Sequence, residues 1–294
     1  MKRKFAIIEA PSVLGLYSSG VENLPDALLA AGLADCLGAR RVARVLSPPY
    51  NNRRDPGTLL LNGEGIADYS FNLANVVGDV INAGEFPVVI GGDCSILLGC
   101  LLAVKRRERH HGLLYLDGHA DFYQPSAEPN GEVASMVLAL ATGRGPAILS
   151  NLENRGALVK DEDVVLFGNR DAEEVEQEGS QRVEDTSINI MDIEKIRTSP
   201  VDDCARLAVD HLSQVENGFW VHTDADVLND AMMPAVDYRV PGGLSWDELV
   251  VTLNEIASSD KAIGINITIF NPNLDKDGTI ADAFTHSLCK GLLP

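Results

Sequence analysis

The stretch LLYLDGHAD, Leu113–Asp121, decides the fold: a run of apolar residues gives way to alternating acidic and imidazole side chains. A continuous apolar run fits a strand that is buried on both faces, as the strands of parallel sheets are. Seven further runs of this kind lie along the chain. Together with Leu113–Leu116 they predict eight strands, the others being Phe5–Ile8, Val42–Leu46, Pro87–Ile90, Val164–Phe167, Ile188–Met191, Phe219–His222 and Ala262–Ile267.

Segments of helical periodicity separate these runs. They are Pro25–Leu37, Ser70–Asn82, Ser95–Arg107, Ala134–Thr142, Val201–Gln214 and Trp246–Ser258. Alternation of strands and helices predicts βαβ units, and hence an α/β fold: a three-layer α/β/α sandwich around a central parallel sheet of about eight strands. A chain of 294 residues could hold two domains. No linker or repeat divides it, so we expect a single domain over residues 1–294.

Composition narrows the classes of partner. The formal net charge of −19 repels phosphates, which argues against nucleic acid and against anionic membrane surfaces. No apolar stretch is long enough to cross a bilayer. The five cysteines are scattered and never spaced as CxxC. This pattern makes a disulfide framework unexpected and favours a reducing, cytoplasmic location.

Polar residues follow several of the predicted strands, at the edge where open parallel sheets bind ligands. Asp117, His119 and Asp121 come directly after one strand. Every second side chain of an extended segment points the same way, so these three can converge on one point. Asp224 and Asp226 repeat the arrangement after another strand. One such motif alone could be a surface loop, but two at the same sheet edge favour a binding site.

Clustered carboxylates repel one another unless a cation lies between them. Carboxylate and imidazole together suit Mn²⁺, with Fe²⁺ or Zn²⁺ as alternatives, and two ions match the charge better than one. A pair of metal ions can lower the pKa of a water molecule and present hydroxide to an electrophilic carbon. The sequence therefore predicts a metal centre that acts on a small-molecule substrate.

Three motifs resemble those of the arginase/agmatinase (ureohydrolase) family: LDGHAD at Leu116–Asp121, HTDADVLND at His222–Asp230 and GGDCS at Gly91–Ser95. Weaker likenesses are Gly168–Glu173 and Gly264–Pro272. The resemblance implies an eight-stranded parallel sheet, a dinuclear manganese centre, hydrolysis of a C–N bond in a guanidino or amidino group, and a homo-oligomer. It also implies a ligand set. Asp117 and Asp224 would bridge both ions, His119 and Asp226 would complete one site, and Cys94 and Asp121 the other.

Cys94 departs from the family, which has a metal-binding histidine at this position. A thiolate favours Zn, Fe or Cu over Mn, and a thiol must lose its proton to bind. The Cys94 site would then be weak for Mn²⁺ or hold Fe or Zn, unless the thiol lies outside the coordination sphere. A helix N-terminus and a nearby cation would both favour the thiolate.

The residues on the substrate side of the predicted site also differ from those of the family. Ala134 stands where arginase has the histidine thought to shuttle protons, and Ile269 stands where the family has the glutamate that receives the guanidinium. Asn130 and Glu132 replace residues that hold the amino-acid end of arginine, and Tyr123 replaces an asparagine at its carboxylate. A planar cation needs a carboxylate partner, so we do not expect L-arginine to be the substrate.

Asp121 and Glu132 are the predicted catalytic residues. Glu132 could serve as general acid/base or anchor a cationic substrate, or it could be an exposed loop carboxylate. Glu173 is predicted to contact substrate, or else to be a solvated carboxylate at a helix start. His222 precedes Asp224 and is predicted to pack behind the ligands rather than to bind metal.

The leading hypothesis is a metal-dependent hydrolase that cleaves a C–N bond by attack of a metal-bound hydroxide. A second is a catalytically silent relative that binds metal for regulation or assembly, which the loss of the guanidinium glutamate favours. A third is a deacetylase-like amidohydrolase, because a neutral amide does not need that glutamate.

Overall fold

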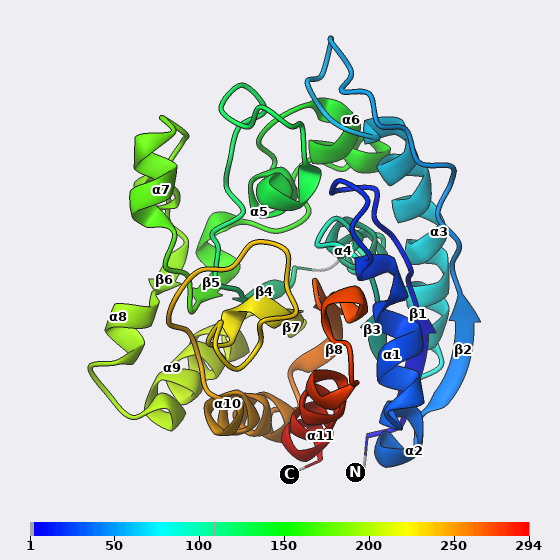
Figure 1. Ribbon diagram of the computed structural model, residues 1–294, viewed down its shortest axis with the longest axis vertical. Helices are drawn as coiled ribbons and strands as arrows, with labels where there is room; N and C mark the ends of the chain where they lie inside the picture. The colour runs from blue at the N-terminus through cyan, green and yellow to red at the C-terminus, as the bar shows by residue number, and fades with distance from the viewer. Residues whose placement is uncertain (1–2, 109, 294) are drawn as a thin grey trace.

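The computed structural model describes residues 3–108 and 110–293, and its strands form one parallel sheet (Figure 1). The order across the sheet is β2-β1-β3-β8-β7-β4-β5-β6. The strands are β1 (Phe5–Glu9), β2 (Arg40–Arg44), β3 (Phe86–Ile90), β4 (Gly112–Leu116), β5 (Val164–Phe167), β6 (Asn189–Met191), β7 (Phe219–Asp224) and β8 (Ala262–Thr268). All eight predicted strands are therefore present, with ends that shift by two residues or fewer.

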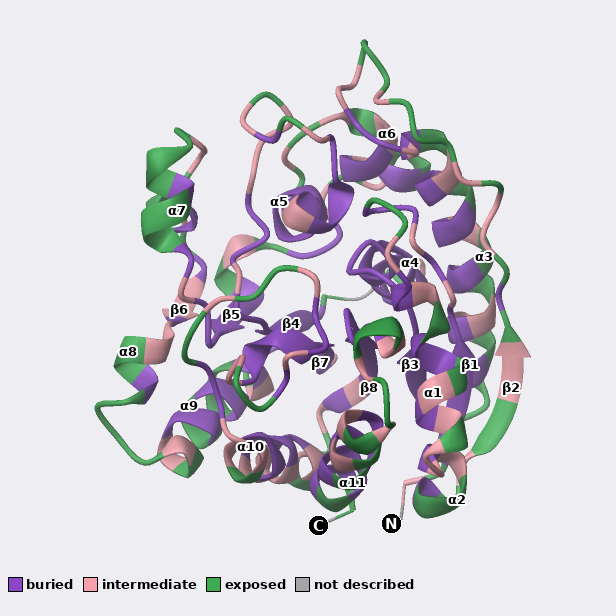
Figure 2. Ribbon diagram, in the orientation of Figure 1, coloured by how far each residue is buried: buried purple, intermediate pink, exposed green. Residues whose placement is uncertain are grey.

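Two layers of helices enclose the sheet and confirm the three-layer sandwich. One layer contains α3 (Gly63–Asn82), α4 (Ile96–Lys105), α5 (Val137–Ala141) and α6 (Ala147–Ser150). The other contains α1 (Leu24–Ala30), α2 (Leu33–Leu37), α9 (Val201–Ser213), α10 (Trp246–Ser258) and α11 (Thr279–Leu292). Two short helices, α7 (Ala172–Gln177) and α8 (Ile193–Ile196), lie at the β6 edge. Figure 2 shows the central strands buried, whereas the edge strands β2 and β6 are partly exposed, as are the outer faces of α7 and α8.

Several helical segments differ from the sequence-based expectation. Helix α3 begins at Gly63 instead of Ser70, and α6, α7 and α8 were not predicted. The predicted helix Pro25–Leu37 is two helices, because Gly32 takes a left-handed backbone with φ of 90° and interrupts it. The segment Ala134–Thr142 begins with a 3₁₀ turn before α5. Helix α11 was absent from the predicted set, although its buried residues Phe284, Leu288 and Leu292 have helical spacing.

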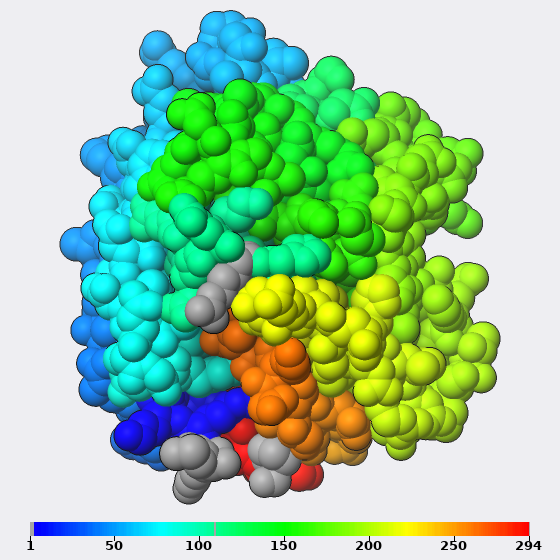
Figure 3. Space-filling view, turned by 180° about the vertical axis from the view of Figure 1, so that it is seen from behind, coloured from blue at the N-terminus to red at the C-terminus, as the bar shows by residue number. Residues whose placement is uncertain are grey.

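Cys36 on α2 and Cys289 on α11 form a disulfide bond, so the expectation of no disulfide was wrong. The two residues are 253 positions apart, and only the fold brings their helices together, with a Cα–Cα distance of 6.2 Å. Figure 3 shows from behind that N-terminal (blue) and C-terminal (red) segments of the chain adjoin at the lower edge. Cys100 and Cys204 are buried free thiols. The disulfide removes one support for a reducing compartment.

The glycines after β3 explain how the chain reaches the sheet edge. A Cβ atom on Gly91 would lie 2.0 Å from the carbonyl oxygen of Ala10, and one on Gly92 would lie 2.0 Å from that of Ser12. Only glycine permits the chain to cross the exit of β1 so closely, and this crossing places Cys94 directly before α4. No helix among residues 3–108 and 110–293 is both long and apolar enough to span a membrane.

Candidate metal centre

The candidate ligands come from the ends of three strands, β3, β7 and β4, with β8 between β3 and β7. Cys94 follows β3, Asp117 and His119 follow β4, and Asp224 is the last residue of β7, with Asp226 just beyond it. Their ligand atoms fall into two groups whose members lie within 4.8 Å of one another. The first group is Cys94, Asp117, His222 and Asp224, and the second is Asp117, His119 and Asp226. Asp117 belongs to both groups, as a bridging ligand would.

The convergence does not arise from extended chain, as the alternating spacing had suggested. After β4 the backbone bends at Gly118 and His119, and the amide N–H of His119 donates to Asp117 Oδ1 at 2.7 Å. Asp226 lies in a 3₁₀ turn that Asp224 caps, since Asp224 Oδ1 accepts from the Asp226 amide at 2.8 Å. Bent loops, closed by their own carboxylates, therefore gather the side chains.

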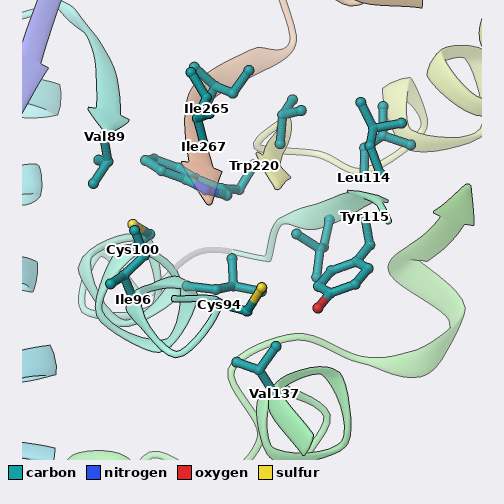
Figure 4. Close-up of a cluster of buried hydrophobic side chains, with 14 of the residues drawn as sticks. Val89, Cys94, Ile96, Cys100, Leu114, Tyr115, Val137, Trp220, Ile265 and Ile267 are labelled. Carbon is teal, nitrogen blue, oxygen red and sulfur yellow. The ribbon is translucent and has the colours of Figure 1, made fainter. Parts of the chain in front are cut away.

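The first group is held by hydrogen bonds to Asp224. The Cys94 thiol donates to Asp224 Oδ2 at 2.8 Å, and the Thr268 hydroxyl of β8 donates to the same oxygen at 3.3 Å. Cys94, Asp224 and Thr268 are all almost completely buried. The thiol thus points toward the carboxylate of Asp224. In Figure 4, which does not draw the carboxylates, the sulfur lies on the side of Cys94 that faces Tyr115 and Val137.

The second group centres on a pair formed by imidazole and carboxylate. His119 Nδ1 lies 3.0 Å from Asp226 Oδ2, and the Gly118 amide donates to Asp226 Oδ1 at 3.0 Å. A Cβ atom on Gly118 would lie 2.9 Å from Asp226 Oδ1. Glycine at this position therefore lets the two loops meet, and the His119 ring remains partly exposed.

Asp121 belongs to neither group, and its place as a ligand beside Cys94 stays a prediction. Its backbone takes a left-handed conformation with φ of 46°, and its carbonyl accepts from the amides of Leu138 and Ala139 at the start of α5. The Tyr115 hydroxyl donates to its carboxylate. The backbone turn and Tyr115 together direct this carboxylate, which still lines the adjoining cavity.

Burial dominates the electrostatics of the carboxylates. It raises the pKa of Asp117 to about 7, with the charge of Asp226 acting in the same direction, and it raises the pKa of Asp121 and Asp224 as well. Burial would also raise the pKa of Asp226, but the charge and hydrogen bond of His119 lower it to about 2.

The pKa of the Cys94 thiol is raised, although its place at a helix N-terminus had predicted that it would be lowered. Burial raises the pKa of this thiol well above its usual range, and the charge of Asp224 raises it further. A thiolate at this position therefore requires a bound cation to offset burial and the neighbouring carboxylates.

An orphaned carboxylate oxygen shows that the donor set fits a metal. Asp117 Oδ2 is buried without a hydrogen-bond partner among the described residues, and it lies 3.6 Å from His222 Nε2. Buried carboxylates left unpaired are costly, and a divalent cation would compensate them. The sulfur of Cys94 adds a soft donor to one group, while the other offers only oxygen and nitrogen.

A cavity of about 280 Å³ opens onto this centre. Four of the predicted substrate residues line it: Tyr123, Asn130, Glu132 and Ile269. Glu173 does not line the cavity, because it lies on the solvent-facing side of α7. Its neighbour Glu174 and, one helical turn on, Glu178 line the wall instead.

Glu132 is built into the cavity wall and is not an exposed loop carboxylate. The residue is only 4% exposed. Its Oε1 accepts from the Tyr17 amide at 2.7 Å, and its Oε2 accepts from the Tyr238 hydroxyl at 2.7 Å and from Asn130 Nδ2 at 3.3 Å. These contacts fix its position at the wall.

Sequence reasoning missed two residues that hold the loops in place. Arg170 donates to the backbone carbonyls of Asp226 and Leu228, and Asp171 accepts from the Ala120 amide at 2.8 Å. Both belong to the GNRD segment, which had been noted only for its likeness to a family motif. An arginine next to an aspartate after a buried strand was the available signal.

Known proteins resemble this chain over nearly its whole length. The model of the arginase family matches residues 3–292. An arginase from Brevibacillus brevis is 30% identical over 293 residues, covering 96% of this chain and 95% of that protein. The crystal structure of an arginase from Bacillus cereus superposes with a TM-score of 0.85 at 25% identity, covering 99% and 98% of the two chains. The arginase structure from Bacillus caldovelox superposes with a TM-score of 0.88 at 24% identity, with 99% of each chain covered.

Proposed function

This chain belongs to the arginase family, and on that premise we propose that it is a metal-dependent hydrolase of a guanidino or amidino compound other than L-arginine. Hydrolysis of C–N bonds and a small-molecule substrate are properties of the family. The substrate specificity depends on the residues that line the cavity, and several of these residues differ from those of the family.

The two groups described above would hold the cations. Asp117 would serve both, Cys94 and Asp224 one, and His119 with Asp226 the other. When bound, a manganese pair would supply a hydroxide at neutral pH and polarise the substrate. The chain's own contribution is to fix these donors: the Gly118 and His119 amides orient the carboxylates, and Arg170 ties the loop that carries Asp226.

The observation that carries the proposal is the wall facing the centre. Ile269 lines the cavity with φ of 71°, and it offers no charge to a guanidinium. Several carboxylates also line the cavity, among them Glu128, Glu132, Glu174, Glu178 and Asp237. The cation among the lining residues, Arg239, is paired with Asp230 at 3.1 Å. Such a wall attracts a second positive charge on the substrate and repels a free carboxylate.

We therefore expect a substrate that carries an amine, and no carboxylate, at the end remote from the hydrolysed group. Agmatine and L-arginine differ in this carboxylate, so urea release from each by the Mn²⁺-loaded protein tests the idea. We expect kcat/KM to be at least about tenfold higher for agmatine, which corresponds to about 1.4 kcal/mol. Turnover of L-arginine at ordinary enzyme rates, roughly 1–10³ per second, would contradict it.

The α7 carboxylates provide a matched set of variants. Replacing both Glu174 and Glu178 with glutamine should raise KM for agmatine while leaving kcat nearly unchanged, because the remote end is bound equally before and during reaction. Glu173→Gln removes a charge from the same helix outside the cavity and should change neither constant. An effect per charge from Glu173→Gln as large as that from the double variant would show that α7 acts only through its overall charge.

Ile269→Glu tests the position that should receive the guanidinium. A β-branched residue is strained at positive φ, so glutamate is tolerated better there. The variant should bind guanidinium compounds more tightly than the parent does. Metal binding without turnover of any guanidino, amidino or acetylated amine would instead favour a catalytically silent relative, and release of acetate would favour a deacetylase.

A further inference from the structure

A fully buried chain of polar side chains links β7 and β8 behind the metal centre. Trp220 Nε1 lies 2.8 Å from Asn266 Oδ1, and Asn266 Nδ2 lies 2.7 Å from His222 Nδ1. Each of the three residues is 0% exposed. The far ring nitrogen, His222 Nε2, lies 3.6 Å from Asp117 Oδ2. Figure 4 shows Trp220 beside Ile265 and Ile267, within the apolar core.

The tautomer of His222 follows from the indole. An indole N–H can only donate a hydrogen bond, so the atom of Asn266 that faces Trp220 must be the amide oxygen. The Asn266 NH₂ group then faces His222, and it too can only donate. His222 Nδ1 must therefore accept, and its lone pair is used.

The opposite orientation of the Asn266 side-chain amide is excluded by its free-energy cost. It would set the NH₂ group of Asn266 against the indole N–H, leaving two buried donors face to face without an acceptor. Rotation of the imidazole is also opposed, because the ring stacks on Tyr115 with centroids 4.3 Å apart and an interplanar angle of 20°. The orientation of Asn266 is thus fixed by the indole N–H of Trp220, and the orientation of the His222 ring is fixed by its stacking on Tyr115.

We propose that His222 is held as the neutral tautomer with its proton on Nε2, facing Asp117 Oδ2, and is a positioning residue rather than a metal ligand. The inference rests on the proposed function only in the role that it gives to Asp117. A protonated Nε2 has no lone pair to give a cation, although it lies within the ligand group of Cys94, Asp117 and Asp224. His222 therefore does not replace the imidazole that is absent at position 94.

The position of the proton on His222 determines how this residue acts on Asp117. The Nε2–H group attracts Asp117 Oδ2 and orients the carboxylate shared by both ligand groups. Asn266 sets this direction: its amide nitrogen can only donate to Nδ1, whereas a carboxylate at the same position could accept from both Trp220 and His222. Asn266→Asp should therefore move the imidazole proton to Nδ1 and free the Nε2 lone pair for metal.

Long-range ¹H–¹⁵N correlation spectra of histidine-labelled protein test the tautomer without any measurement of activity. The chain has 6 histidines, and loss of one pattern in His222→Gln assigns the signal. We expect the Nε2–H pattern for His222 in metal-free protein and in protein loaded with diamagnetic Zn²⁺. An Nδ1–H or doubly protonated pattern in the metal-free protein, or loss of the Nε2 proton when Zn²⁺ binds, would overturn the proposal.

Zn²⁺ affinity of Asn266→Asp supplies the second measurement. The freed lone pair should strengthen Zn²⁺ binding by roughly ten- to a hundredfold, the range typical of residues that orient metal ligands, and the His222 pattern should change to Nδ1–H. Asn75→Asp adds the same charge at an exposed position of α3 and should change neither. An unchanged tautomer in folded Asn266→Asp would overturn the proposal, whether or not the protein hydrolyses any substrate.

Discussion

Removal of the metal should invert the ordinary pH dependence of stability in this protein. Asp117 is almost completely buried, and burial raises its pKa from 3.8 to about 7. A carboxyl group whose pKa is higher in the folded chain binds its proton more tightly there. The metal-free fold therefore loses stability as the pH rises from about 4 to about 7.

The size of the loss follows from the difference between the two pKa values. From 3.8 to about 7 is roughly three units, and each unit corresponds to about 1.4 kcal/mol, which gives a loss of about 4 kcal/mol from Asp117 alone. Asp121 and Asp224, whose pKa values are also raised, act in the same direction. Asp226 has a lowered pKa of about 2, so its contribution is lost only below this window.

Urea unfolding of the chelated protein at pH 4.5 and at pH 7.5 measures this loss directly. Excess Mn²⁺ should reverse the slope, because metal binds the deprotonated carboxylates and stabilises the fold that holds them. Asp117→Asn removes one titration and should flatten the metal-free slope by about 4 kcal/mol. Asp79→Asn, at an exposed position of α3, is the control and should leave the slope unchanged.

Two results would refute the reasoning. Metal-free protein that is equally or more stable at pH 7.5 than at pH 4.5 would show that burial of the carboxylates does not cost what their pKa values imply. An Asp117→Asn variant that keeps the full pH slope would assign the effect to other groups, for example to the general repulsion within a chain of net charge −19.

Three further outcomes are expected. Asp117→Ala should reduce bound metal, measured by elemental analysis, more than Asp226→Ala does, since Asp117 alone belongs to both ligand groups. Cys94→His should raise the Mn²⁺ content toward two ions per chain and lessen its dependence on pH, because an imidazole needs no loss of a high-pKa proton; equal Mn²⁺ binding by the parent and the variant would exclude Cys94 as the limiting ligand. Gly91→Ala should cost several kcal/mol of stability, with a Cβ 2.0 Å from a carbonyl oxygen, whereas Gly78→Ala on α3 meets nothing within 4 Å and should stabilise by up to about 1 kcal/mol.

The central strands were predictable because strands buried on both faces must be apolar at consecutive positions, and this pattern stands out without any knowledge of the partner strands. The edge strand β2 is mostly exposed, and its predicted ends were displaced by two residues. The gathering of acids at one edge followed from the parallel order. Assembly into a homo-oligomer and a cytoplasmic location stay predictions, which light scattering and fractionation would check.

The finer features depend on geometry that sequence spacing does not contain. Glu173 and Glu174 are adjacent in the sequence, but on a helix one residue turns about 100° from the next, and only Glu174 reaches the cavity. Asp121 was predicted from extended geometry that its positive φ replaces. The proton on His222 depends on Trp220 and Asn266, whose partnership appears only when β7 and β8 lie side by side.

The strand order also bears on when the protein can fold. β3 and β4 are consecutive strands in the sequence, yet β8 and β7 lie between them in the sheet. During synthesis, the gap between β3 and β4 can be filled only after Thr268, the last residue of β8, has left the ribosome. Until then the inner edges of both strands stay unpaired, and contacts as distant as Val88 with Ile265 have yet to form. Folding should therefore be slow and largely post-translational, and Cys94 and Asp117 meet only once the final third of the chain has been inserted between them.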